Sequence, residues 1–84
     1  MPLPNESVTL SVEQIHALNQ KLTDLRHDAN NSLSLMVAAV ELIQHRPETA
    51  GHMWNTLLEQ PAKISGTIAQ FSREFESALR ITRP

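Results

Sequence analysis

The stretch of this sequence that can do chemistry runs from Leu25 to Ile43 and reads LRHDANNSLSLMVAAVELI. Within it, His27 is followed directly by Asp28 and, one helical turn later, by Asn31. An imidazole titrates near neutrality, so its neutral, nucleophilic form is available. An adjacent acid can orient one ring nitrogen or accept its proton while the other nitrogen attacks. This combination suits phosphoryl transfer, in which positioning and charge stabilisation supply most of the catalysis.

The first element that must position these residues is a helix with a readable start. Ser11 and Gln14 have the spacing of a capping box, in which each side chain bonds the backbone of the other. Leu10 and Ile15 stand where a hydrophobic staple would form. Residues 1–10 then form an N-terminal arm that precedes the helix.

The second element is another long helix after a short turn. Pro47 disfavours helical geometry in the residue before it, so the first helix is expected over about residues 11–45. The second is expected over about residues 48–81, with Thr49 and Asn55 as alternative caps. A connection this short makes the two helices antiparallel neighbours. The predicted fold is therefore an all-α, antiparallel two-helix hairpin.

Each predicted helix carries an apolar stripe with alternating spacings of three and four residues. Pro61 lies on the second stripe and is expected to kink that helix or to divide it. Two helices alone cannot hide both stripes, so we expect the hairpin to form a homodimer, a four-helix bundle. The stripes are Ile15, Leu18, Leu22, Leu25, Ala29, Leu33, Met36, Val40 and Ile43, then Trp54, Leu57, Leu58, Ile64, Ile68, Phe71, Phe75 and Leu79.

His27 is predicted to point away from this seam. If Leu22 and Leu25 occupy the a and d positions of a heptad, His27 falls at f, farthest from the neighbouring helix. A histidine on a solvated helix face most often has no function, so its position alone does not establish a site. The expected polar face comprises Thr23, Asp24, His27, Asn30, Asn31 and Ser34.

The other candidate residues are expected to be structural or solvated. His16, His45 and His52 have no further ligands at a recognisable metal spacing, so no metal site is predicted. The aromatic residues and methionines of the stripes are expected to fill the bundle core rather than to line a ligand cage. These are Trp54, Phe71, Phe75, Met36 and Met53.

Composition narrows the class of protein. A chain of 84 residues with a net charge of -2 is expected to form one domain that does not bind nucleic acid. With 0 cysteines it suits a reducing compartment, and its start does not resemble a signal peptide. The longest apolar run, Leu35 to Val40, is too short for membrane insertion. We therefore expect a cytoplasmic protein.

The segment HDANNSLSLMVAAVELI resembles the histidine box of sensor histidine kinases, in their dimerisation and histidine-phosphotransfer (DHp, HisKA-like) domain. That family's domain is a helical hairpin that dimerises into a four-helix bundle, so the resemblance implies the same architecture here. The motif spans about twenty residues of the chain. The matching positions are His27, Asp28, Asn30, Asn31, Leu33, Glu41 and Leu42.

The resemblance also implies a role for each polar residue. His27 matches the phosphoacceptor, Asp28 the acid that assists as a base, and Asn31 the position that places water for dephosphorylating a partner. The implied function is exchange of a phosphoryl group between His27 and the aspartate of a response-regulator receiver domain, in a two-component or phosphorelay pathway. That partner would bring Mg²⁺, and no cofactor is expected in this chain. Ser32 departs from the family, where many members carry proline.

Kinases of this family carry an ATP-binding domain after the hairpin, and this chain has no segment that resembles a nucleotide-binding loop. We therefore expect a phosphotransfer domain that depends on a separate kinase or ATP-binding domain. It is either an excised piece of a longer kinase or a hairpin that stands alone, and Met1 with the capped helix start favours the second.

Two other interpretations compete with phosphotransfer. One is a non-catalytic dimerisation or adaptor bundle that docks a signalling partner, and the other is an unrelated coiled-coil fragment.

Overall fold

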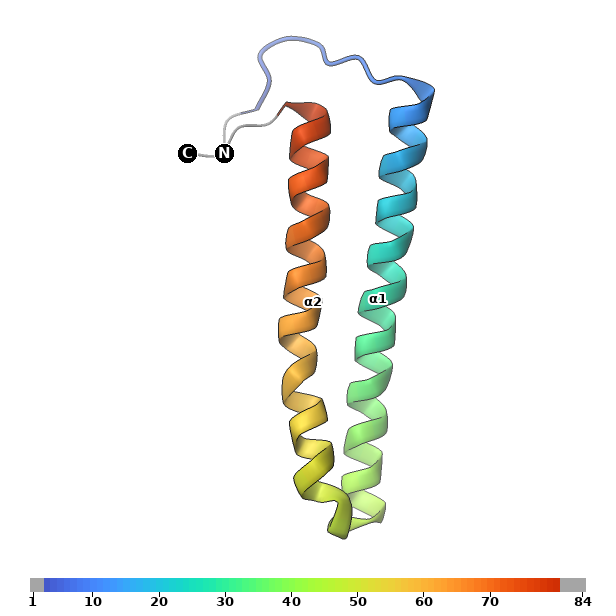
Figure 1. The fold of residues 1–84 in the computed structure, drawn as a ribbon, viewed down its shortest axis with the longest axis vertical. Coiled ribbons are helices and arrows are strands. Elements are labelled where there is room, and N and C mark those ends of the chain that lie inside the picture. The colour runs from blue at the N-terminus through green and yellow to red at the C-terminus, as the bar shows by residue number, and fades with distance from the viewer. Residues whose placement is uncertain (1–2, 81–84) are drawn as a thin grey trace.

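The computed structural model describes residues 3–80 and places them in a helical hairpin (Figure 1). Helix α1 comprises Val12–His45, a single 3-10 turn η1 comprises Pro47–Thr49, and helix α2 comprises Ala50–Leu79. The two long helices run antiparallel, side by side, with η1 at one end and the N-terminal arm at the other. The predicted all-α hairpin is therefore confirmed.

The start of α1 is held by the capping box that the sequence predicts. The Gln14 backbone N–H donates to Ser11 Oγ at 3.1 Å, and the Ser11 backbone N–H donates to Gln14 Oε1 at 2.8 Å. Two backbone donors that would otherwise lack partners are thus satisfied. At the other end, the Arg46 N–H donates to the Leu42 carbonyl at 2.7 Å, directly before Pro47 ends the helix.

The start of α2 differs from the prediction. Thr49 is the N-cap residue, but it makes no capping hydrogen bond and has helical backbone angles. Its hydroxyl instead donates to the Arg46 carbonyl at 2.8 Å. Thr49 is also the last residue of the 3-10 turn, so the chain is already helical before α2 begins. Asn55 lies inside α2 and is not a cap.

Helix α2 ends slightly earlier than predicted. Its last residue is Leu79, and Arg80 adopts a left-handed backbone conformation with φ 57°. Such a residue terminates an α-helix because its N–H turns back to the preceding carbonyls, here those of Glu76 and Ser77. The predicted terminal residue, Ile81, lies outside the described residues.

Pro61 does not divide α2, so that alternative of the prediction is wrong. The helix is continuous from Ala50 to Leu79, although a proline has no N–H to donate to the Leu57 carbonyl. The residue before it, Gln60, is 1% exposed, and its Nε2 donates to the Thr56 carbonyl at 2.8 Å. Packing against α1 thus holds the helix together across the proline.

The hairpin is a thin, elongated layer. It measures 58 × 28 × 12 Å, and its radius of gyration of 18.1 Å far exceeds the ~12 Å of a compact domain of this length. Its accessible surface of 6488 Å² likewise exceeds the roughly 5,000 Å² expected of a compact monomer of this mass. Within residues 3–80, Ala39 is the one fully buried apolar residue.

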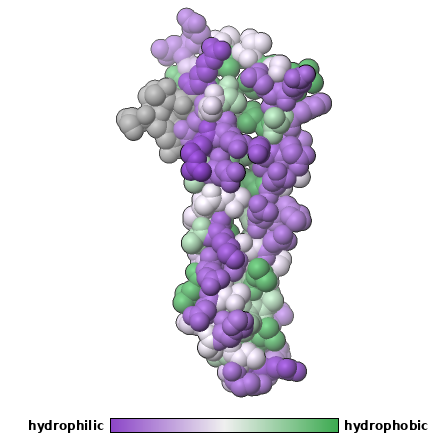
Figure 2. Space-filling view, in the orientation of Figure 1, coloured by the Kyte–Doolittle hydropathy of each residue, from purple (hydrophilic) through white to green (hydrophobic). Residues whose placement is uncertain are grey.

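The two broad faces of the layer differ in polarity. The face shown in Figure 2 is mostly hydrophilic, with apolar patches toward the end that carries η1. Helical spacing places most of the exposed stripe residues on the opposite side of both helices. In this isolated hairpin, three of the nine residues of the first predicted stripe and four of the eight of the second remain exposed. The exposed large apolar residues are Leu3, Val12, Ile15, Leu33, Leu35, Val37, Val40, Leu42, Trp54, Leu58, Ile68 and Phe75.

Among the described residues, neither helix is long and apolar enough to cross a membrane.

The buried side chain of Gln60 generates a prediction about stability. Its Oε1 is buried without a hydrogen-bond partner, and an unpaired buried acceptor costs about 1–3 kcal/mol. The substitution Gln60→Met keeps the length of the side chain and removes that acceptor. We expect it to raise the free energy of unfolding by about 1 kcal/mol in urea denaturation followed by circular dichroism.

The matched control is Gln70→Met, at an exposed position of the same helix, which should leave stability within about 0.5 kcal/mol. A loss of stability in Gln60→Met would show that the hydrogen bond from Gln60 Nε2 to the Thr56 carbonyl, which the substitution also removes, contributes more than the unpaired Oε1 costs.

Candidate functional site

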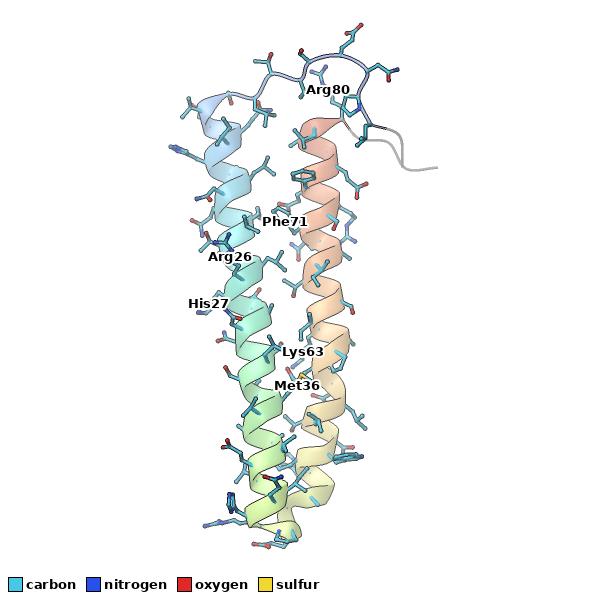
Figure 3. The ribbon with its side chains drawn as sticks, turned by 180° about the vertical axis from the view of Figure 1, so that it is seen from behind. Arg26, His27, Met36, Lys63, Phe71 and Arg80 are labelled. Atoms are coloured by element: carbon cyan, nitrogen blue, oxygen red, sulfur yellow. The ribbon has the colours of Figure 1, made fainter. Side chains whose placement is uncertain are left out.

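His27 lies near the middle of α1 and points away from α2 (Figure 3). Its side chain is 75% exposed, so a second protein can reach the ring without any rearrangement of the hairpin. This position is the one predicted from the heptad count. The other members of the predicted polar face, Thr23, Asp24, Asn30, Asn31 and Ser34, are also exposed.

Two polar side chains approach the same nitrogen of the imidazole. Asp28 Oδ1 is 3.9 Å from His27 Nδ1, and Asn31 Nδ2 is 3.4 Å from it. Both distances are longer than a strong hydrogen bond, and both side chains can rotate because they are exposed. The other ring nitrogen, Nε2, has no hydrogen bond or ion pair to any residue from 3 to 80.

The two contacts favour opposite tautomers of the ring. An Asn31 amide that donates to Nδ1 requires the proton of the neutral ring to sit on Nε2, which removes the lone pair of that nitrogen from attack. Asp28 can accept only from a protonated Nδ1, and that tautomer leaves the Nε2 lone pair free. Asn31 is compatible with the second tautomer if its oxygen, rather than its nitrogen, faces the ring. Rotation of the Asn31 amide therefore makes this contact compatible with either neutral tautomer of the ring.

Asp28 lines the groove between the two helices, whereas His27 does not. One cleft of this groove is lined by Asp28, Asn31, Ser32, Leu35, Gln60, Lys63 and Thr67. An adjoining cleft is lined by Lys21, Asp24, Leu25, Asp28, Thr67, Gln70, Phe71 and Glu74. Asp28 and Thr67 thus separate two clefts on the hydrophilic face. The α2 residues that line these two clefts lie between Gln60 and Glu74.

An ion pair spans the second of these clefts. Lys21 Nζ lies 3.6 Å from Glu74 Oε1, and both side chains are partly exposed. An exposed pair of this kind contributes at most about 1 kcal/mol. Lys21 is therefore already in an ion pair. Lys63, the other lysine near Asp28, has no ion pair among the described residues.

Sequence reasoning missed two of the residues that α2 contributes, Gln60 and Lys63. Lys63, Thr67 and Gln60 share clefts with Asp28, and Ser32 is only 7% exposed although the sequence suggested no interhelical role for it. The signal that was available is their spacing: residues 60, 63 and 67 recur at three and four and so share one face of α2. That face of α2 is polar and lies outside the predicted apolar stripe.

The remaining histidines do not join the site. His16, His45 and His52 are exposed at separate positions along the hairpin. Within residues 3–80, no group of three or more histidine and acidic side chains is arranged to hold a metal ion.

No family model matches this chain, and neither the curated proteins nor the solved structures include one with significant similarity to it. The case for a function therefore depends on the geometry of the site and on the resemblance of the histidine segment.

Because the His27 side chain is 75% exposed, we expect that the ring does not stabilise the fold. The substitution His27→Gln should change the free energy of unfolding by less than about 0.5 kcal/mol, as surface substitutions usually do. Urea denaturation followed by circular dichroism measures this. Ala39→Leu is the comparison, because inserting volume at the fully buried Ala39 should cost about 1–3 kcal/mol. A clearly destabilised His27→Gln variant would assign the ring to the fold instead.

Proposed function

We propose that this chain is a histidine phosphotransfer module that exchanges a phosphoryl group between His27 and the aspartate of a response-regulator receiver domain. The observation that carries the proposal is the exposed His27 ring with Asp28 and Asn31 at one nitrogen and the other nitrogen open. The histidine segment supports it, because its polar positions match the phosphotransfer motif in register. The hairpin architecture is also compatible with a DHp domain.

The proposed transfer uses the Nδ1–H tautomer of the ring. Nε2 attacks the phosphorus of the receiver's acyl phosphate, the P–O bond to the aspartate breaks, and the aspartate leaves as a carboxylate. The new N–P bond makes the ring cationic, and Asp28 stabilises that charge and takes the Nδ1 proton to leave neutral phosphohistidine. Mg²⁺ held by the receiver would neutralise the phosphoryl oxygens. The reverse transfer follows the same steps backward.

We further propose that the hairpin works as a homodimeric four-helix bundle in the cytoplasm. The support is the excess surface of the isolated hairpin and the apolar residues exposed on one side of both helices. Covering that side with the same side of a second copy buries both stripes at once, as a twofold interface does. His27 lies on the outer edge of α1, so the pairing leaves it accessible.

Phosphotransfer is tested by incubating the chain with receiver domains that carry a radioactive phosphoryl group. We expect acid-labile, base-stable label on the wild-type chain and none on His27→Gln. His16→Gln is the matched control, since His16 is an exposed histidine of the same helix without an acid after it. Asp28→Asn should slow labelling by about 100-fold, the lower range for a general base.

Label that survives His27→Gln, or that never appears on the wild type with any receiver tested, would contradict phosphotransfer. Receiver binding without label would instead favour the adaptor bundle.

Dimerisation is tested by light scattering after gel filtration. We expect twice the mass of one chain and a melting temperature that rises with protein concentration. Ile68→Lys should shift the protein toward the monomer, because it places a charge on the exposed apolar side of α2. Leu35→Lys is the control, because Leu35 is 48% exposed but lines the polar cleft instead. A monomer of wild type at all concentrations would contradict the bundle.

A further inference from the structure

Lys63 is the cation of the second helix that faces the candidate site. It lines the cleft that also contains Asp28 and Asn31, so α2 places it beside the residues that surround Nδ1 of the histidine (Figure 3). It is one of two lysines in the chain, and the other, Lys21, is paired with Glu74 at 3.6 Å. Among the described residues, Lys63 has no ion-pair partner, and its side chain is exposed and free to move.

The other cation near His27 in the sequence cannot take this position. Arg26 immediately precedes the histidine, but successive helical residues are rotated by about 100°, so it stands about 160° around the helix from Asp28. Figure 3 shows Arg26 on α1, on the side away from the cleft that Lys63 lines. The charged groups that line the hydrophilic groove are Asp24, Asp28, the Lys21–Glu74 pair, Lys63 and, farther along, Arg73. Of the cations, Lys63 is the one that shares a cleft with Asp28 and has no ion pair among the described residues.

The cleft that Lys63 lines contains polar groups that suit a hydrogen-bond donor such as an ammonium. Gln60 precedes Lys63 by three residues and so lies on the same side of α2. Its Oε1 is buried without a donor, and Ser32, across the interface, is the other buried polar residue of the hairpin. The cleft that Lys63 lines is otherwise polar apart from Leu35, and its anionic side chain is Asp28. The cleft is thus suited to hold the Lys63 head group.

We propose that Lys63 is an electrostatic positioning residue for phosphotransfer, an inference that rests on the proposed function of His27. A phosphoryl group on the ring adds roughly 1.5–2 negative charges beside Asp28, and two anions in one place repel each other. The Lys63 ammonium offsets this charge from the opposite helix and leaves the Asp28 carboxylate free to take the Nδ1 proton. It acts through charge and not through contact with the reacting atoms.

The experiment measures the rate at which His27 is labelled by phosphoramidate, a small phosphoryl donor, at low ionic strength. We expect Lys63→Met to be about threefold to fivefold slower than wild type, the factor that corresponds to an exposed charge interaction of up to about 1 kcal/mol. Lys63→Arg should restore the rate because it keeps the charge. Arg46→Met is the matched control and should keep the wild-type rate, since it removes an exposed positive charge at the turn, away from the clefts that Asp28 lines.

Salt separates an electrostatic role from a structural one. At 1 M salt the screening length falls to about 3 Å, so the rates of Lys63→Met and wild type should converge. A loss of rate that persists at high salt, or a Lys63→Met variant as fast as wild type at low salt, overturns the role of Lys63 while phosphotransfer itself stands. A wild-type chain whose His27 takes no label from phosphoramidate or from any receiver domain overturns the proposed function, and the role of Lys63 with it.

Discussion

The constraint on which the rest of this structure depends is that two helices share only one line of contact. Each helix can bury only the residues that face the other, and in this hairpin that leaves Ala39 as the one fully buried apolar residue of the described chain. Hydrophobic burial is the main source of stability, so a layer one helix thick has little of it. An apolar side of the hairpin remains exposed, and burying it against a second copy would stabilise both chains.

The same geometry explains why a polar site can exist on so small a protein. Helical spacing places most of the exposed stripe residues on one broad face of the layer. The polar residues of both helices lie on the other face, which Figure 2 shows to be mostly hydrophilic, and along the outer edge of α1. His27 occupies the edge, where a partner can reach it, and Asp28 occupies the groove, where a second helix can influence it. Adjacent residues of a helix point in directions about 100° apart. His27 can therefore lie on the outer edge of α1 while Asp28, the next residue, lies in the groove.

The interface between the helices is also polar at the level of the site. Ser32 and Gln60 are buried there, and Pro61 follows directly in α2. The histidine segment carries serine where many sensor kinases carry proline, while this chain has its helix-interior proline at the same level of the opposite helix. An unpaired amide oxygen and a missing backbone donor both weaken local packing.

The sequence alone determined the features that depend on residues one to four positions apart. The capping box at Ser11, the end of α1 before Pro47 and the outward direction of His27 all follow from local spacing, and the structure has each of them. The function inferred from the histidine segment stays a prediction. Local spacing also predicted Thr49 or Asn55 as the cap of α2 and a kink or a division at Pro61. Thr49 is the N-cap residue but makes no capping hydrogen bond with its side chain, and the helix is not divided at Pro61.

Only the tertiary structure decided which residues of α2 join the site. Whether Lys63 faces Asp28 or solvent depends on the rotation of α2 about its axis and on its axial alignment with α1. Both are set by how all the side chains of the interface pack together, and no single segment contains that information. The burial of Ser32 and Gln60 has the same origin.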